Sequence, residues 1–297
     1  MPRKFIAAAI ILALLQATPT HAEPGRALWV WSMAKIYPST AYQQQLLDFL
    51  DAPRGNSDIP IKTVFCSGAK LSGLTDPESS SEIRAFNSAA HARGVTVYLL
   101  CGDPSWAEPE HEQDALDWVD AVIAFNAHAS AARRFDGFQY DVEPAAADGW
   151  PSPPLMMSFH KLFVDTRHLI DASGERLLFS AATQMAWAEI ADPATGVDVD
   201  QDVIASTDNV AVMSYRTTVD KLEDGADRTF GHAVDAGKKC WVGVETNDET
   251  PPSITFYRLG DSVLEGVLAQ AYPHFGSHPG WLGYAIEDYA GYSALAP

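Results

Sequence analysis

Three polar side chains alternate with apolar ones in the segment FDGFQYDVEP, near the middle of the chain. In an extended strand Gln139, Asp141 and Glu143 share one face, because successive side chains point to opposite faces. Two carboxylates this close influence each other, since the charge on one raises the pKa of its neighbour. We expect Glu143 to carry the proton as a general acid and Asp141 to stay charged. Pro144 ends the strand just beyond Glu143.

Other polar and aromatic residues follow further apolar runs and are candidates for the same site. Met213 and Tyr215 share one face of the run VMSY. The acidic and amide candidates at the ends of other runs are Asp103, Gln184, Glu245, Glu287 and Asp288. Tryptophan rings can stack on sugars and on cations, and the candidates are Trp31, Trp106, Trp150 and Trp187. This set predicts an acidic, polar bowl that suits a hydroxyl-rich or cationic ligand.

Eight short apolar runs recur along the chain and predict the strands that position these residues. They are Leu28–Ser32, Lys62–Ser67, Val95–Gly102, Gly137–Glu143, Leu177–Gln184, Val210–Arg216, Cys240–Thr246 and Trp281–Asp288. Helix-like stretches lie between most of them, including Ala41–Leu50, Glu82–Arg93, Glu110–Arg134 and Leu155–Ala172. Strands that alternate with helices pair in parallel, and eight of them predict a single α/β (β/α)8 TIM barrel. The connection Asp198–Thr207 holds only a short helix, and the last helix is expected to be short or missing.

The N-terminal residues have the pattern of a secretory signal. A basic start at Arg3 and Lys4 precedes an apolar run, and small residues follow at Thr20 and Ala22. The apolar run is about half of the roughly 20 residues that span a bilayer. We therefore expect residues 1–22 to be removed and residues 23–297 to form the barrel domain, exported to the periplasm or the extracellular space without membrane insertion.

Charge and cysteine content restrict the partners. The formal net charge is −19, with 39 Asp and Glu against 20 Lys and Arg, so the surface repels nucleic acid. The three cysteines Cys66, Cys101 and Cys240 lie in apolar runs and are expected to be buried; a bridge between Cys66 and Cys101 stays open. The sequence contains no CxxC, HxH or HExxH, and we expect no metal and no other cofactor.

The segment around Glu143 resembles the DxxDxDxE signature of glycoside hydrolase family 18, the chitinases and endo-N-acetylglucosaminidases. Asp136, Asp141 and Glu143 match the first, third and last acidic positions, and Gln139 stands where the second Asp would be. The resemblance implies that Glu143 is the general acid. It also implies that Asp141 orients the substrate's own N-acetyl group, which acts as the nucleophile. Gln139 can form hydrogen bonds but cannot titrate.

A second segment strengthens this resemblance, and a third departs from it. Met213 and Tyr215 are similar to the family's Met-x-Tyr element, which implies that the Tyr215 hydroxyl contacts the N-acetyl carbonyl. We place Tyr215 with the catalytic residues, and Asp136, Gln139 and Met213 with the substrate-binding ones. The eighth run ends in Glu287 and Asp288, where the family often has a Trp.

Three hypotheses stay open on the sequence. The first is a glycoside hydrolase that acts on an oligo- or polysaccharide containing amino sugars, with Glu143 as acid. The second is a glycosidase of another barrel family, which pairs Glu143 with a distant carboxylate such as Glu245 or Glu287. The third is a carbohydrate-binding barrel without turnover, because a fold does not determine a function.

Overall fold

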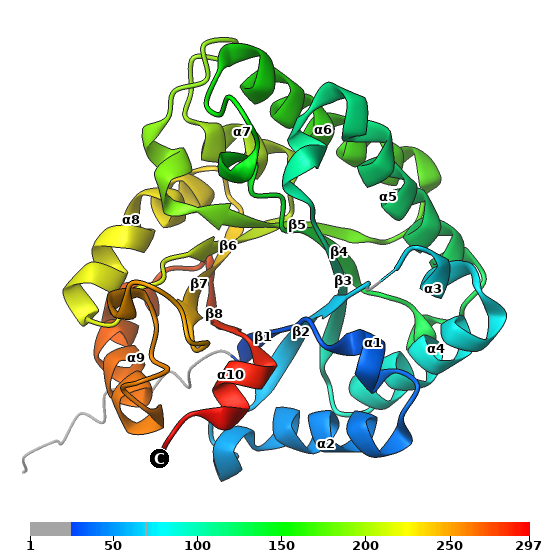
Figure 1. The fold of residues 1–297 in the computed structure, drawn as a ribbon, viewed down its shortest axis with the longest axis vertical. Coiled ribbons are helices and arrows are strands. Elements are labelled where there is room, and N and C mark those ends of the chain that lie inside the picture. The colour runs from blue at the N-terminus through cyan, green and yellow to red at the C-terminus, as the bar shows by residue number, and fades with distance from the viewer. Residues whose placement is uncertain (1–24, 69) are drawn as a thin grey trace, which may run out of the picture.

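The chain folds into one closed barrel of eight parallel strands, in the order β1-β2-β3-β4-β5-β6-β7-β8, as the computed structural model shows (Figure 1). The structure describes residues 25–68 and 70–297, so the predicted signal peptide lies outside the described residues. The strands are β1 (Arg26–Val30), β2 (Ile61–Ser67), β3 (Thr96–Cys101), β4 (Gly137–Tyr140), β5 (Leu178–Gln184), β6 (Asn209–Met213), β7 (Lys239–Glu245) and β8 (Trp281–Glu287). The α/β barrel prediction is therefore confirmed.

Helices surround the barrel on its outer side (Figure 1). They are α1 (Met33–Ile36), α2 (Thr40–Asp51), α3 (Ser72–Thr75), α4 (Pro77–His91), α5 (Glu112–Ala127), α6 (Pro153–Ser173), α7 (Val199–Ser206), α8 (Val219–Asp235), α9 (Asp261–Phe275) and α10 (Tyr289–Ala294). Short 3₁₀ turns are η1 (Pro53–Gly55), η2 (Pro104–Ala107), η3 (Pro109–His111), η4 (Ala131–Arg133), η5 (Pro144–Ala146), η6 (Met185–Glu189) and η7 (Pro252–Ile254). The last helix, α10, is short, as expected.

Local sequence explains where individual helices begin and end. Helix α6 starts at two prolines, which are tolerated in the first turn, and ends at Gly174, whose φ of 69° is readily adopted by glycine. Helix α7 begins with a capping box between Asp198 and Gln201. Helix α5 ends at Ala127, so the predicted helix Glu110–Arg134 was too long.

Two apolar layers fill the fold, one inside the barrel and one between strands and helices. The inner layer is built on tightly packed aromatic rings, with Phe65 lying 5.3 Å from Trp29 and 5.4 Å from Trp241, centroid to centroid. The outer layer includes Phe138 and Tyr140 of β4, and the Tyr140 hydroxyl is 2.9 Å from Thr166 of α6. The two faces of β4 therefore alternate as predicted.

Strand β4 ends earlier than predicted, at Tyr140 instead of Glu143. The backbone N–H of Asp141 still donates to the Cys101 carbonyl, at 3.0 Å, so Asp141 keeps the strand direction. Glu143, with φ −106° and ψ 80°, has left it and leads into turn η5. Glu143 therefore lies at the rim of the barrel instead of inside the sheet.

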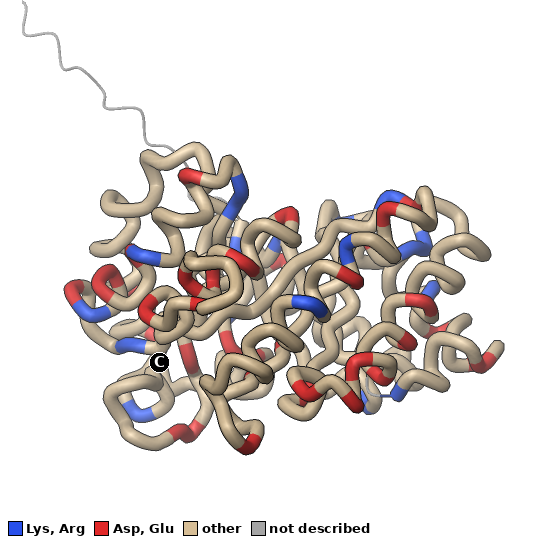
Figure 2. The backbone as a smooth tube through the Cα atoms, turned by 90° about the horizontal axis from the view of Figure 1, so that it is seen from above, with Lys and Arg blue, Asp and Glu red and all other residues tan. Residues whose placement is uncertain are grey.

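Asp and Glu positions are spread along the whole described backbone, with Lys and Arg positions between them (Figure 2). All three cysteines are buried and unbridged, which confirms their predicted burial and answers the open question about Cys66 and Cys101. Among the described residues, no helix combines the length and the apolar character needed to cross a bilayer.

Candidate active site

Gln139 reaches into the barrel from β4, and its polar atoms are bonded there. Its Oε1 accepts a hydrogen bond from Trp29 Nε1 at 2.8 Å, and its Nε2 donates to Ser180 Oγ at 3.0 Å. The side chain is completely buried. Because both of its groups have protein partners, Gln139 anchors the floor of the site, below Asp141.

Asp141 lies above Gln139 and is the least satisfied carboxylate of the site. Its Oδ1 atom is buried and has no hydrogen-bond partner. Burial raises the pKa of Asp141 to about 7, and the charge on Glu143 adds to the rise. Asp141 therefore holds a proton over much of the range below neutral pH. The low-dielectric surroundings disfavour its ionised form, so the charged state expected for Asp141 is reached only above about pH 7.

Glu143 is held at the rim by a short relay of side chains. Gln184, at the end of β5, donates from Nε2 to Glu143 Oε2 at 2.7 Å. Trp187 Nε1 in turn donates to Gln184 Oε1 at 3.1 Å. Trp187 is completely buried and packs on Phe159, with 5.2 Å between the ring centroids, so its ring cannot stack on a sugar. Trp187 is a positioning residue that acts through Gln184.

Tyr215 follows β6 and lies among the carboxylates of the mouth. Burial raises the pKa of its hydroxyl well above the usual value, so the group stays protonated and can donate a hydrogen bond. Negative charges add to this rise, and they come from Glu287, Asp141, Glu245 and Glu143, in decreasing order. Met213 packs in the inner apolar layer next to Tyr215. The tyrosine hydroxyl therefore lies within electrostatic reach of four acidic groups.

Glu245 and Glu287 form the opposite wall of the mouth. They are register partners at the ends of β7 and β8. Glu245 is 5% exposed, and its Oε1 accepts hydrogen bonds from the Thr246 backbone N–H and from Asn247. Burial raises the pKa of Glu245 to about 7.

Glu287 differs from Glu245 in its donor, which is an exposed tryptophan. Its Oε1 accepts a hydrogen bond from Trp31 Nε1 at 2.6 Å. Burial raises the pKa of Glu287 well above its usual value, and the charges of Asp288 and Glu245 raise it further. A hydrogen-bond donor or a positive charge on a ligand would therefore stabilise the ionised form of both carboxyls.

Asp136 does not line the site, which corrects the sequence-based assignment. It precedes β4, at the opposite end of the strand from Glu143. Its Oδ2 accepts hydrogen bonds from the Val97 backbone N–H at 2.8 Å and from His91 Nε2 at 2.9 Å. Alternation already indicates this, because Asp136 shares its face with Phe138 and Tyr140 of the outer layer; the assignment to the site came from the family resemblance.

Two further acidic candidates cap local turns. Asp103 is exposed and accepts hydrogen bonds from the backbone N–H and the hydroxyl of Ser105, at the start of η2. Asp288 is 6% exposed and accepts from the Gly291 backbone N–H, at the start of α10. Their oxygens are engaged in the protein, so both residues shape the rim and neither is placed to bind a ligand with that oxygen.

The remaining tryptophans divide into exposed and packed rings. Trp31 is 39% exposed at the mouth. It lines a small pocket of about 260 Å³ together with Trp106 and Trp118. Trp106 is itself 7% exposed and packs on Tyr140, so little of its ring is available for stacking. Trp150 packs on Phe159 of α6, with 5.6 Å between ring centroids.

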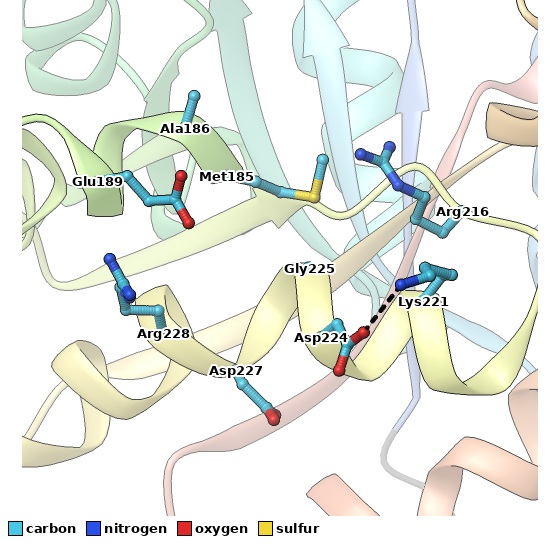
Figure 3. A pocket seen from close by; sticks show the side chains of 9 residues that line it. All are labelled: Met185, Ala186, Glu189, Arg216, Lys221, Asp224, Gly225, Asp227 and Arg228. Atoms are coloured by element: carbon cyan, nitrogen blue, oxygen red, sulfur yellow. Dashed lines mark hydrogen bonds and ion pairs between the residues drawn. The ribbon is translucent and has the colours of Figure 1, made fainter.

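A larger pocket of about 710 Å³ opens between turn η6 and helix α8, beside the mouth (Figure 3). Its lining has side chains of both charge signs. Lys221 Nζ lies 3.2 Å from Asp224 Oδ2, and Arg216 Nη1 donates to the backbone carbonyl of Tyr215 at 2.7 Å. Arg216 follows Tyr215 directly, and Met185, also in the lining, follows Gln184. Two residues of its lining are thus direct sequence neighbours of the site residues Gln184 and Tyr215.

Side chains of the types that can bind metal ions gather at two places outside the mouth. In the part of the chain that the structure describes, the groups with donor atoms within 4.8 Å of one another are His160, Asp192 and Asp202, and Asp198, Asp200 and His232. His232 accepts or donates a hydrogen bond with Asp200 at 2.9 Å. Neither group includes a carboxylate of the mouth.

Trp29 and Ser180 are the site residues that the sequence analysis missed. Both contact Gln139 inside the barrel. The signal that could have found them is strand alternation, because Trp29 shares a face with Trp31, and Ser180 shares one with Gln184. Their contact with Gln139 depends on closure of the barrel, which brings β1 and β5 to the same interior.

No protein-family model and no curated protein sequence matches this chain. Solved structures do match it. A GH18 chitinase from Pseudoalteromonas aurantia matches with a TM-score of 0.58 and 12% identity, over 90% of this chain and 94% of that one. A class V chitinase from Nicotiana tobaccum matches with a TM-score of 0.57 and 13% identity, over 91% and 95%.

A mutant of the same tobacco enzyme, in complex with NAG4, matches with a TM-score of 0.55 and 12% identity, over 91% of this chain and 95% of that one. These similarities are structural, and at such low sequence identity they show the fold alone. The chain is a divergent barrel with the fold of the GH18 chitinases.

Proposed function

We propose that the protein is an exported glycoside hydrolase that acts on a glycan containing amino sugars, with Glu143 as general acid. The observation that carries the proposal is the pair at the end of β4. Asp141 has a buried, unpartnered Oδ1, and Glu143 beside it is held at the rim by Gln184. A buried acceptor without a partner costs about 1–3 kcal/mol. It is tolerable where a substrate donor completes it.

The chemistry follows from these positions. Glu143 donates its proton to the glycosidic oxygen as the bond from that oxygen to the anomeric carbon breaks. The carbonyl oxygen of the substrate's N-acetyl group attacks the same carbon, and water later opens the intermediate and returns a proton to Glu143. The amide N–H of that group donates to the Asp141 carboxyl group, and Tyr215 donates to the carbonyl. Gln139, engaged by Trp29 and Ser180, takes no proton.

A second mechanism is favoured by Glu245 and Glu287. Both line the opposite wall, and both contribute to the raised pKa of Tyr215, as Glu143 does. One of them could act with Glu143 as the second carboxylate of a two-carboxylate glycosidase. A separation of about 5–5.5 Å between the carboxyl groups fits a nucleophile, and about 6.5–9.5 Å leaves room for an attacking water.

The partner in this proposal is a carbohydrate. The tobacco chitinase mutant with a similar fold is described as a complex with NAG4, which supports an oligosaccharide ligand here. The proposal of export rests on the signal-like residues 1–22. The acidic surface repels nucleic acids and anionic membranes, so we propose neither as a partner.

The test is a hydrolysis screen of the full chain against chitin oligomers, chitosan oligomers and other glycans, with the Glu143→Gln variant alongside. Removing a general acid costs about 10²–10⁴ in rate, so kcat should fall at least about a hundredfold. The control is Asp120→Asn, which removes one exposed charge on α5 and should leave kcat unchanged.

Two outcomes would contradict the proposal in different ways. A wild-type rate in Glu143→Gln would place the acid elsewhere, with Glu245 and Glu287 the next candidates. Binding of a glycan without cleavage, lost when Trp31 is replaced, would make the protein a carbohydrate-binding barrel.

A further inference from the structure

In the part of the chain that the structure describes, the four carboxylates of the mouth, Asp141, Glu143, Glu245 and Glu287, have no positively charged partner. Hydrogen bonds to Glu143, Glu245 and Glu287 come from neutral amide, indole and backbone groups, and Asp141 Oδ1 receives none. Within the described residues, none of the four forms an ion pair with Lys, Arg or His. Carboxylates that are buried without a counter-charge are costly, so the site gains when a ligand supplies one.

The arrangement of these carboxylates suits an organic cation better than a metal ion. Among the described residues, no three mouth carboxylates bring oxygen atoms within 4.8 Å of one another, as they would have to around a single ion. The acids instead lie at or just beyond the ends of three strands, β4, β7 and β8. An ammonium group on a larger molecule can approach this group of carboxylates from the solvent side of the mouth.

Trp31 supplies the aromatic surface that such a cation needs. Its indole Nε1 is fixed on Glu287 at 2.6 Å, while 39% of the residue stays exposed. Cations bind well over a tryptophan ring, and an adjacent carboxylate strengthens the attraction. A carboxylate pair at Glu245 and Glu287 beside an oriented indole thus provides both charge and a stacking face.

We propose that the mouth selects glycans with free primary amines, and that it seats the ammonium group of a deacetylated hexosamine between Glu245, Glu287 and the Trp31 ring. The inference rests on the proposed function and names its substrate class. In the closed strand order, β8 and β1 lie across the barrel from β4 and β5. We place the amine-bearing unit next to the one at Asp141 and Glu143, so that a partly deacetylated polymer satisfies both.

Calorimetric titration of the full-length Glu143→Gln variant tests this without any need for turnover. The probes are a glucosamine tetramer, which carries free amines, and an N-acetylglucosamine tetramer of the same length. We expect the glucosamine tetramer to bind at least about tenfold more tightly in low salt, and the preference to shrink as salt is added.

Adding Glu287→Gln to this variant should weaken glucosamine binding by about tenfold and change binding of the acetylated tetramer by less than about twofold. Asp120→Asn, with the same loss of one charge on the outer helix α5, is the control and should change neither. Thermal unfolding checks that the variants fold, and Glu245→Gln replaces Glu287→Gln if the latter does not.

Equal or weaker binding of the glucosamine tetramer, or no binding of either probe, would overturn the inference. So would a preference that survives Glu287→Gln and Glu245→Gln. Because hydrolysis by the wild-type protein is measured separately, these results leave the role of Glu143 standing. Conversely, a protein that binds the amine selectively and cleaves nothing would refute the proposed hydrolase and keep the inference.

Discussion

Acidic residues at the two ends of the barrel have opposite surroundings. At the end where the strands begin, Asp136 and Asp208 repeat one arrangement. Each accepts the backbone N–H of the preceding strand at 2.8 Å, from Val97 and Phe179 respectively. Each also meets a basic side chain from a surrounding helix: His91 Nε2 is 2.9 Å from Asp136, and Arg167 Nη1 is 3.1 Å from Asp208.

At the end where the strands finish, the carboxylates lack such partners. Asp141 Oδ1 has no hydrogen bond, and Glu245 and Glu287 have only neutral donors. The same residue type therefore stabilises the fold at one end and is held in an unfavourable environment at the other. This difference is what the proposed function uses, because a ligand bound at the end where the strands finish could supply the donors or positive charges that the protein does not.

The largest expected difference between the two ends concerns turnover. Asp141→Asn should lower kcat by about a hundredfold, since it removes the group that orients the substrate beside the general acid. Asp208→Asn keeps an oxygen for the Phe179 N–H and should leave kcat within about twofold. Steady-state kinetics on whichever glycan the screen identifies would measure both. A comparable loss in the two variants would remove the functional distinction between the ends.

Stability should respond in the opposite sense. Asp136→Ala leaves the Val97 N–H without its acceptor at the start of a strand, and should lower the free energy of unfolding by about 1–3 kcal/mol. Asp120→Ala, on the exposed side of α5, should change it by no more than about 0.5 kcal/mol. Urea unfolding measures both. If Asp136→Ala were as stable as wild type, this aspartate would not contribute to stability at the end where the strands begin.

The pH dependence of stability should also differ between the two ends, because the raised pKa values belong to the end where the strands finish. The pKa values of Asp141 and Glu245 are raised to about 7 in the folded protein, against about 4 for such groups in an unfolded chain. Between about pH 4 and pH 7 the folded protein therefore holds protons that the unfolded chain has released. The free energy of unfolding falls with rising pH across this window, and the contribution of both groups is lost above it.

The double variant Asp141→Asn, Glu245→Gln lacks these two titrations. Its free energy of unfolding should fall less than that of wild type between pH 4.5 and pH 7.5, by roughly 3 kcal/mol for each of the two groups removed. Urea midpoints at the two pH values give the measurement. An identical fall in both proteins would mean that these two carboxyls are not protonated in the folded state.

Much of the fold and the central line of the site could be predicted from local pattern. Apolar runs located all eight strands, and alternation alone placed Gln139 and Asp141 inside the barrel, because both signals depend only on neighbouring residues. The roles of other residues depend on contacts distant in sequence. Trp187 was assigned to sugar stacking, yet Phe159 and the rest of the outer layer bury it.

The proton assignment at Asp141 failed for a related reason. The spacing of two carboxylates shows that they interact, but not which of them is more deeply buried. Barrel closure decides that, by enclosing Asp141 Oδ1 while Glu143 leaves the strand for the rim and meets Gln184. Burial then raises the pKa of Asp141.

The smallest expected effect concerns Trp31, where the acidic end meets solvent. Trp31→Phe keeps an aromatic face but removes the N–H that Glu287 Oε1 accepts. This hydrogen bond lowers the pKa of Glu287, in opposition to burial, so its loss leaves Glu287 protonated to higher pH and less attractive to a cation. A phenyl ring also binds cations less well than an indole. Together these changes should weaken glucosamine-tetramer binding by about twofold to fivefold, as measured by calorimetry. Trp281→Phe is the matched control, because Trp281 Nε1 has no hydrogen-bond partner and its ring stacks on Phe275 at the far end of β8. Binding that is unchanged in Trp31→Phe, or equally weakened in Trp281→Phe, would show that the indole at the mouth does not orient Glu287 toward a ligand.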